Sequence, residues 1–134
     1  MKEDDILRKY NCVAIVGVSP NEDRDSNRVA RYLSEHGYNV IPVNPNATQI
    51  IGKKCYPDLI SIPQQVEIVD IFRKPEEVGP TADEAIKVGA KVIWMQEGIE
   101  HLDGTARARA AGLTVIQDRC ILKEYAKRFV AEGI

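Results

Sequence analysis

Residues 13–28, VAIVGVSPNEDRDSNR, decide the fold expected for this chain. An apolar, largely β-branched run ends at Gly17, a polar segment follows, and the apolar residues then recur at helical spacing from about Ser26 onward. A strand, a loop and a helix in this order open a doubly wound α/β domain, in which phosphate-bearing ligands bind at the first loop. The loop is unusual, because it spans about ten residues and lacks the G-x-G-x-x-G pattern of a tight glycine turn.

Composition and charge are those of an ordinary globular protein. The chain has 134 residues, 44% hydrophobic and 28% charged, so we expect one domain over residues 1–134. A formal net charge of −2 gives no overall attraction to nucleic acid or to a membrane surface. The sequence shows no signal peptide or membrane-spanning run, and Cys12, Cys55 and Cys120 lack a C-x-x-C spacing. We therefore expect a cytoplasmic protein in a reducing compartment.

Hydrophobic patterns predict alternating helices and strands along the chain. Helices are predicted at residues 4–10, from an N-cap at Ser26 or Asn27 to about 36, and at 75–88, 101–111 and 121–130. Strands are predicted at residues 12–16, 38–43, 66–72, 91–95 and 113–117, with a short, weak edge strand at 50–56. Alternation of this kind forms right-handed βαβ units. The predicted fold is α/β, a Rossmann-like, doubly wound, mostly parallel sheet in three layers.

Candidate site residues follow from this topology, because ligands of open parallel sheets bind at the carboxyl ends of the strands. The residues that follow the predicted strands are Gly17-Val18-Ser19, Asn44-Pro45-Asn46, Phe72-Arg73-Lys74, Gln96-Glu97-Gly98 and Asp118-Arg119-Cys120. They offer glycines for close backbone approach, amide and hydroxyl groups, and three cations. This set suits an anionic ligand with a polar, extended body. The alternative for each residue is an ordinary polar loop position.

Two independent features disfavour a nicotinamide dinucleotide. NAD sites usually place an acidic residue at the end of the second strand, where it binds the ribose hydroxyls. Here that strand ends Ile41-Pro42-Val43-Asn44 without an acid, and Gly17 stands alone where the glycine fingerprint would be.

Catalytic patterns are weak. The sequence contains no Ser-His-Asp order, metal-ligand cluster or phosphate-binding P-loop. His36 is expected at a helix end and His101 as a surface or capping residue at a helix start. Cys120 precedes a helix and follows Arg119, an environment that can activate a thiol, so a reactive or ligand-touching role competes with packing. Cys12 and Cys55 are expected in packing.

Six short motifs occur in an order that resembles a known family. They are Val16-Gly17-Val18-Ser19-Pro20, Ser26-x-Arg28-Val29, residues 40–45 (VIPVNP), residues 69–73 (VDIFR), residues 94–98 (WMQEG) after Gly89-Ala90-Lys91, and Asp118-Arg119-Cys120. Over residues 11–125 the chain resembles the stand-alone CoA-binding domain proteins (the YccU-like family). These are relatives of the N-terminal domain of the succinyl-CoA synthetase alpha subunit.

The resemblance implies that coenzyme A binds across the carboxyl edge of the sheet. The positions that it implies are Gly17, Val18 and Ser19 at the nucleotide end, Ser26 and Arg28 near phosphate, Asn44 and Pro45 on the second-strand side, Phe72 and Arg73 on the adenine side, and Gln96 and Gly98 toward the pantetheine path. Two positions depart from the family. Asn46 stands where members often carry Lys, with Lys53 or Lys54 as substitutes, and Ile121 follows Cys120 where many carry Pro.

Three functions remain open from the sequence. The first is a protein that binds CoA or an acyl-CoA without independent catalysis, as a carrier, a sensor or a protein partner in acyl-CoA metabolism. The resemblance supports it, because the synthetase's phosphorylated histidine and nucleotide-grasp portion lie in other domains. The second is a dinucleotide-using or redox enzyme with Cys120 as its functional thiol. The third is a protein-interaction module that keeps the fold and has lost the ligand.

Overall fold

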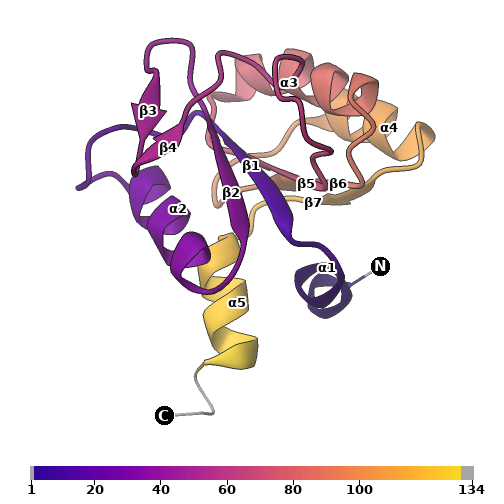
Figure 1. The fold of residues 1–134 in the computed structure, drawn as a ribbon. Helices are drawn as coiled ribbons and strands as arrows, with labels where there is room; N and C mark the ends of the chain where they lie inside the picture. The colour runs from indigo at the N-terminus through magenta and orange to yellow at the C-terminus, as the bar shows by residue number, and fades with distance from the viewer. Residues whose placement is uncertain (1, 131–134) are drawn as a thin grey trace.

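A five-stranded parallel sheet forms the centre of the computed structural model, which describes residues 2–130 (Figure 1). Its strand order is β2-β1-β5-β6-β7, and each neighbouring pair is parallel. The strands are β1 (Cys12–Val16), β2 (Asn39–Val43), β5 (Ile68–Ile71), β6 (Val92–Met95) and β7 (Thr114–Ile116). The predicted α/β, Rossmann-like fold with a mostly parallel sheet is confirmed.

Helices cover both faces of the sheet (Figure 1). One face packs against α3 (Pro75–Lys87) and α4 (Leu102–Ala110). The other packs against α1 (Glu3–Lys9), α2 (Asp25–Glu35) and α5 (Ile121–Phe129). Every residue of β1, β5 and β6 is buried as a result. Strands covered on two faces are apolar almost throughout, which explains the continuous hydrophobic runs in the sequence.

Two predicted elements differ from the structure. The weak edge strand predicted at 50–56 forms instead an antiparallel hairpin of β3 (Gln49–Ile50) and β4 (Lys53–Lys54), and Tyr56 after it pairs with Val43 of the edge strand β2 in a parallel bridge. Ile51 and Gly52 both have positive φ, 49° and 72°, as a two-residue type I′ turn requires, and isoleucine is a rare residue there. The helix expected to be capped by Ser26 or Asn27 begins at Asp25, with Arg24 at the N-cap. The other element boundaries agree to within about two residues.

The chain reverses its direction across the sheet between β1 and β5. It runs from β1 to the edge strand β2 through α2, returns past β1 to β5, and continues through α3 and α4 to β6 and β7. Because α2 and α3 cover opposite faces, the segments that leave β1 and β5 diverge and open a crevice at their carboxyl ends. Gly17 directly follows β1 and Phe72 directly follows β5, so both residues lie at this crevice.

Gly17 is required by the close approach of the two strand ends. Its N–H donates to the Val43 carbonyl at 2.9 Å, and the Phe72 N–H donates to the Val16 carbonyl at 2.8 Å. The φ of Gly17 is +89°, and a Cβ at this position would lie 2.1 Å from the Phe72 carbonyl oxygen. A larger residue therefore needs the backbone after β5 to move.

Asp70 is a fully buried acid in the middle of β5. Its register neighbours are Ile15 in β1 and Trp94 in β6, and neither carboxyl oxygen has a hydrogen-bond partner among residues 2–130. Burial raises the pKa of this carboxyl well above its ordinary value, because the charged form would lose its hydration. Asp70 therefore keeps its proton in the folded state at a pH where the unfolded chain has released it.

Gly17→Ala is expected to lower the free energy of unfolding more than Gly37→Ala. Both glycines have positive φ, +89° and +93°, so both alanines incur a left-handed backbone cost of about 1–2 kcal/mol. Gly37 has nothing within 4 Å of its Cβ position, whereas Gly17 meets backbone. The clash should add about 2 kcal/mol or more, measured by urea unfolding followed by circular dichroism. Equal losses in the two variants would contradict the close approach.

Asp70→Asn is expected to change the pH dependence of stability. In the wild type, a raised folded pKa means that stability is full below about pH 4 and falls as the pH rises toward the folded pKa. Each unit of the shift corresponds to about 1.4 kcal/mol. The variant lacks this loss, so its stability relative to wild type should increase between pH 5 and pH 8 in urea titrations.

Asp58→Asn is the matched control for this measurement. The hydrogen bond from the Ser61 hydroxyl, and then that from the Ser61 backbone, lowers the pKa of Asp58, so its contribution is present above the unfolded pKa and is lost as pH falls through the lower folded pKa. The sign is opposite to that of Asp70. A difference between Asp70→Asn and wild type that stays constant across pH would show that Asp70 is ionised in the fold.

Candidate functional site

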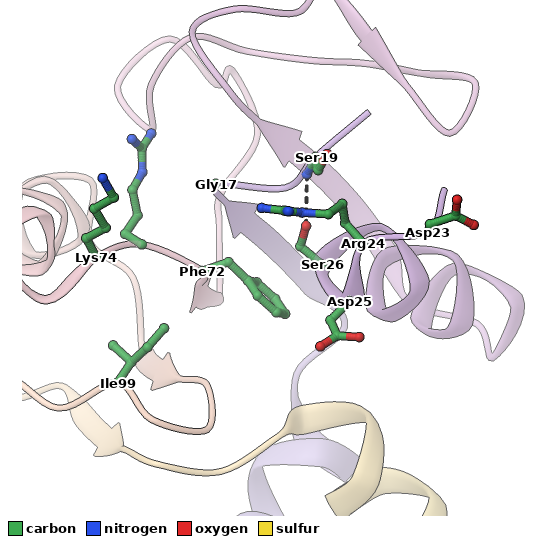
Figure 2. Close-up of a pocket in the computed structure, with 10 residues that line it drawn as sticks. Gly17, Ser19, Asp23, Arg24, Asp25, Ser26, Phe72, Lys74 and Ile99 are labelled. Atoms are coloured by element: carbon green, nitrogen blue, oxygen red, sulfur yellow. Dashed lines mark hydrogen bonds between the residues drawn. The ribbon is translucent and has the colours of Figure 1, made fainter. Parts of the chain in front are cut away.

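A cavity of about 520 Å³ lies at the crevice between the ends of β1 and β5 (Figure 2). Residues after β1, at the start of α2, after β5 and after β6 line it: Gly17, Ser19, Asp23, Arg24, Asp25, Ser26, Phe72, Arg73, Lys74 and Ile99. The volume is in the usual range for small-molecule sites. We call this the first cavity.

Hydrogen bonds to Ser19 fix the loop that leaves β1. The Ser19 N–H donates to Ser26 Oγ at 2.9 Å (Figure 2), and Asn27 Nδ2 donates to the Ser19 carbonyl at 2.9 Å. Ser26 and Asn27 therefore hold the loop instead of capping α2 as predicted. The hydroxyl of Ser26 is already used as an acceptor, and Ser26 lies inside the first turn of the helix.

The N-terminus of α2 is left open toward the first cavity. Arg24 at the N-cap makes no side-chain capping bond, and the N–H groups of Asp25, Ser26 and Asn27 have no partner within the described chain. Unpaired N–H groups and the positive end of the helix dipole favour an anion. The geometry is typical of a phosphate site at a helix N-terminus.

Three cations, Arg24, Arg73 and Lys74, line the first cavity. Figure 2 shows the Arg24 side chain extending toward Gly17, with Lys74 on the far side of Phe72 and Asp23 pointing away. The Nε of Arg73 is buried without a partner among the described residues, and its guanidinium pairs with Glu77 only at 3.9 Å. An arginine guanidinium can bind two oxygens of one phosphate at the same time, so this lining suits a phosphorylated ligand.

A second cavity of about 370 Å³ adjoins the first and shares Asp25, Phe72 and Ile99 with it. Its other lining residues are Arg28, Val29, Gln96, Glu97, Cys120, Leu122 and Lys123. Two ion pairs join residues of this lining, Arg28 with Asp25 at 2.9 Å and Lys123 with Glu97 at 2.8 Å. The two cavities together form an extended site along the carboxyl edge of the sheet.

The structure gathers most, but not all, of the residues implied by the family resemblance. The residues of this set that line the first cavity are Gly17, Ser19, Ser26, Phe72 and Arg73. Those that line the second are Arg28, Gln96 and, again, Phe72. Arg28 is thus engaged by Asp25 and lies outside the first cavity. Four implied residues line neither cavity: Val18, Asn44, Pro45 and Gly98.

The residues outside the cavities have identifiable structural contacts. The Val18 side chain is fully buried, and its carbonyl accepts a hydrogen bond from Asn44 Nδ2 at 2.9 Å. The Gly98 N–H donates to Asp118 Oδ1 at 2.7 Å. Lys53 and Lys54, considered as substitutes for Asn46, lie in β4 and line neither cavity.

Sequence reasoning missed Arg24 and Ile99 as lining residues. Arg24 directly precedes α2, so an expected N-cap two residues before Ser26 would have identified it as the residue at the helix N-terminus. Ile99 carries no comparable signal, because only the folding of the segment after β6 brings it to the cavity that Phe72 also lines.

The histidines and two of the cysteines have the roles expected of them. His101 caps α4, its Nδ1 accepting from the Gly104 N–H at 2.9 Å, and His36 caps the end of α2. Cys12 and Cys55 are buried, and desolvation raises the pKa of both thiols. Among residues 2–130 no three His, Cys, Asp or Glu side chains are grouped to hold a metal ion. In the same residues, no helix combines the length and apolar character needed to cross a bilayer.

Comparison with known proteins gives a consistent result. The family model described as a CoA binding domain matches residues 11–126. The uncharacterized protein YneT of Bacillus subtilis is 34% identical over 117 residues, which are 87% of each chain. The structure of a hypothetical protein from Pyrococcus horikoshii OT3 has a TM-score of 0.91 and 41% identity, with 95% of this chain and 92% of that chain covered.

A larger relative matches over part of the chain. The ADP-forming acetate–CoA ligase I of Archaeoglobus fulgidus is 35% identical over 72 residues, which are 54% of this chain and 10% of the ligase. The matches with YneT and the Pyrococcus protein, in contrast, extend over most of each partner. The family model spans most of the chain, and the chain therefore belongs to the CoA-binding domain family, with homology to the CoA-binding part of ADP-forming acetyl-CoA synthetases.

Proposed function

We propose that this protein binds coenzyme A, free or acylated, at the carboxyl edge of its sheet and has no catalytic activity of its own. The observation that carries the proposal is the open N-terminus of α2, which faces a cavity lined by Arg24, Arg73 and Lys74. Coenzyme A bears a diphosphate and a ribose phosphate, and this charge matches the cations and the unpaired N–H groups.

The phosphates bind between the first turn of α2 and the three cations. The adenine packs against Phe72, an aromatic side chain that both cavities share. The pantetheine arm then extends past Ile99 into the second cavity, where Gln96 and Cys120 lie. The extended shape of coenzyme A fits two adjoining cavities better than a compact nucleotide would.

The absence of catalysis is proposed because both histidines lie outside the two cavities and have structural positions. His101 Nδ1 accepts a hydrogen bond from the backbone of α4, and His36 lies at the exposed C-terminus of α2. The chain spans 10% of the acetate–CoA ligase that it matches, so the ligase activity is not carried over. A carrier, a sensor or a partner of an acyl-CoA enzyme is the role that binding alone supports.

Calorimetric titration tests the proposal with CoA, acetyl-CoA, NAD and ATP. We expect CoA and acetyl-CoA to bind more tightly than NAD. NAD lacks the ribose phosphate, which can form ion pairs with the three cations of the first cavity. No heat from CoA at millimolar concentration would overturn the proposal. Tighter binding of NAD would favour the alternative of a dinucleotide-using enzyme.

Arg24→Ala and Arg73→Ala are each expected to weaken CoA binding by about 1.5–3 kcal/mol, because each removes a charged hydrogen bond to phosphate. Arg109→Ala is the matched control, since Arg109 is an exposed residue in the last turn of α4 and lines neither cavity. Its affinity should equal that of wild type. Unchanged affinity in both variants would show that the first cavity does not bind the phosphates. This result would favour the alternative of a protein-interaction module that has lost the ligand.

A further inference from the structure

Cys120 lines the second cavity, and the proposed binding of coenzyme A assigns no role to its thiol. Cys120 is the N-cap residue of α5 and is partly exposed, whereas Cys12 and Cys55 are buried at 8% and 5% exposure. Cys120 is one of the residues that line this cavity, as are Gln96 and Leu122. Of the three cysteines, Cys120 is the one that a ligand in either cavity could contact.

Gln96 offers a hydrogen-bond donor to a ligand in this cavity. The residue is only 5% exposed, and its Oε1 accepts a hydrogen bond from the Ile121 N–H at 3.2 Å. The oxygen is thereby fixed, so the amide nitrogen is turned the other way, and it has no hydrogen-bond partner among residues 2–130. The nitrogen is not among the fully buried side-chain atoms that lack a partner, so solvent reaches it. Because Gln96 lines the cavity, its Nε2 is available to an acceptor placed there.

The two cavities connect a nucleotide position with this thiol. They share Asp25, Phe72 and Ile99, so a ligand anchored by phosphates in the first cavity extends directly into the second. Lys123 lines the same cavity, and its hydrogen bond to Glu97 raises its pKa. The pantetheine arm carries amide carbonyls, which can accept from Gln96 Nε2, and it ends in a thiol.

We infer that Cys120 is a modification site that forms a mixed disulfide with the ligand's own thiol, supplied as the disulfide form of coenzyme A. This inference rests on the proposed function. The Cys120 thiol loses its proton to solvent, and the sulfur attacks one sulfur of the CoA disulfide. The small-molecule S–S bond breaks as the Cys120–CoA bond forms, and the second CoA leaves as a thiolate that takes up a proton.

The exchange balances without a further oxidant. The Cys120 sulfur is oxidised, the departing CoA is reduced, and the number of disulfide bonds is unchanged. The product keeps the nucleotide tethered in its own site. A thiol reductant releases it, so occupancy of the site follows the redox state of the CoA pool.

The test follows adduct formation by intact-protein mass spectrometry. The full chain is reduced, desalted and incubated with equal concentrations of CoA disulfide or of glutathione disulfide, which lacks the nucleotide. We expect one CoA adduct, mapped to Cys120 by peptide analysis and removed by dithiothreitol. It should form at least tenfold faster than the glutathione adduct. Equal rates with the two disulfides, no adduct, or an adduct on Cys12 or Cys55 would each overturn the inference.

Variants separate a directed reaction from chance reactivity. Cys120→Ser should abolish the adduct, while Cys55→Ala, which removes a buried thiol outside both cavities, should retain it. Gln96→Glu keeps an acceptor for the Ile121 N–H and removes the amide donor. It should therefore lower the ratio of the CoA rate to the glutathione rate. An unchanged ratio in Gln96→Glu would count against the inference.

Calorimetry under reducing conditions separates this inference from the proposed function. If CoA binds and no adduct forms with its disulfide, the inference fails and the binding function stands. If CoA does not bind, the proposed function fails, and the inference falls with it.

Discussion

The contact between the ends of β1 and β5 is the constraint on which the site depends. Gly17 and Phe72 approach so closely that a Cβ on Gly17 would lie 2.1 Å from the Phe72 carbonyl oxygen, and hydrogen bonds tie both strand ends in place. The positive φ of Gly17 directs the chain away from β5 into the loop, which Ser19 then fastens to the first turn of α2. One close contact thereby sets the N-terminus of α2 opposite the residues that follow Phe72.

Three of the protein's cations are concentrated at one cavity. The formal net charge is −2, yet Arg24, Arg73 and Lys74 meet around one cavity with the unpaired N–H groups of α2. Acidic residues of the lining are turned away or engaged: Asp23 points outward in Figure 2, and Asp25 pairs with Arg28. Burial raises the pKa of the acid Asp70, in the strand that leads to Phe72, and so disfavours a negative charge beneath the site.

The fold and the edge that carries the site could be predicted from the sequence, but several residue roles could not. Continuous apolar runs identified β1, β5 and β6, because strands covered on both faces need them. Ser26 was expected to cap α2, since serine favours that position, yet its hydroxyl accepts from Ser19 and Arg24 takes the N-cap. Arg28 was expected near phosphate, and the turn of the helix instead directs it to Asp25 and the second cavity.

The sequence by itself determined the order of the elements, the parallel sheet and the family, because these depend on local hydrophobic periodicity and on short motifs read in order. Only the tertiary structure decided which residues meet, because side chains distant in the sequence come together through strand register and helix packing. Phe72, Gln96 and Cys120 line one cavity from three segments, and the orientation of the Gln96 amide is set by the N–H of Ile121. The strand, loop and helix pattern of residues 13–28 predicts a phosphate site at the loop after Gly17. The structure adds that the open end of α2, and not a glycine turn, borders the first cavity.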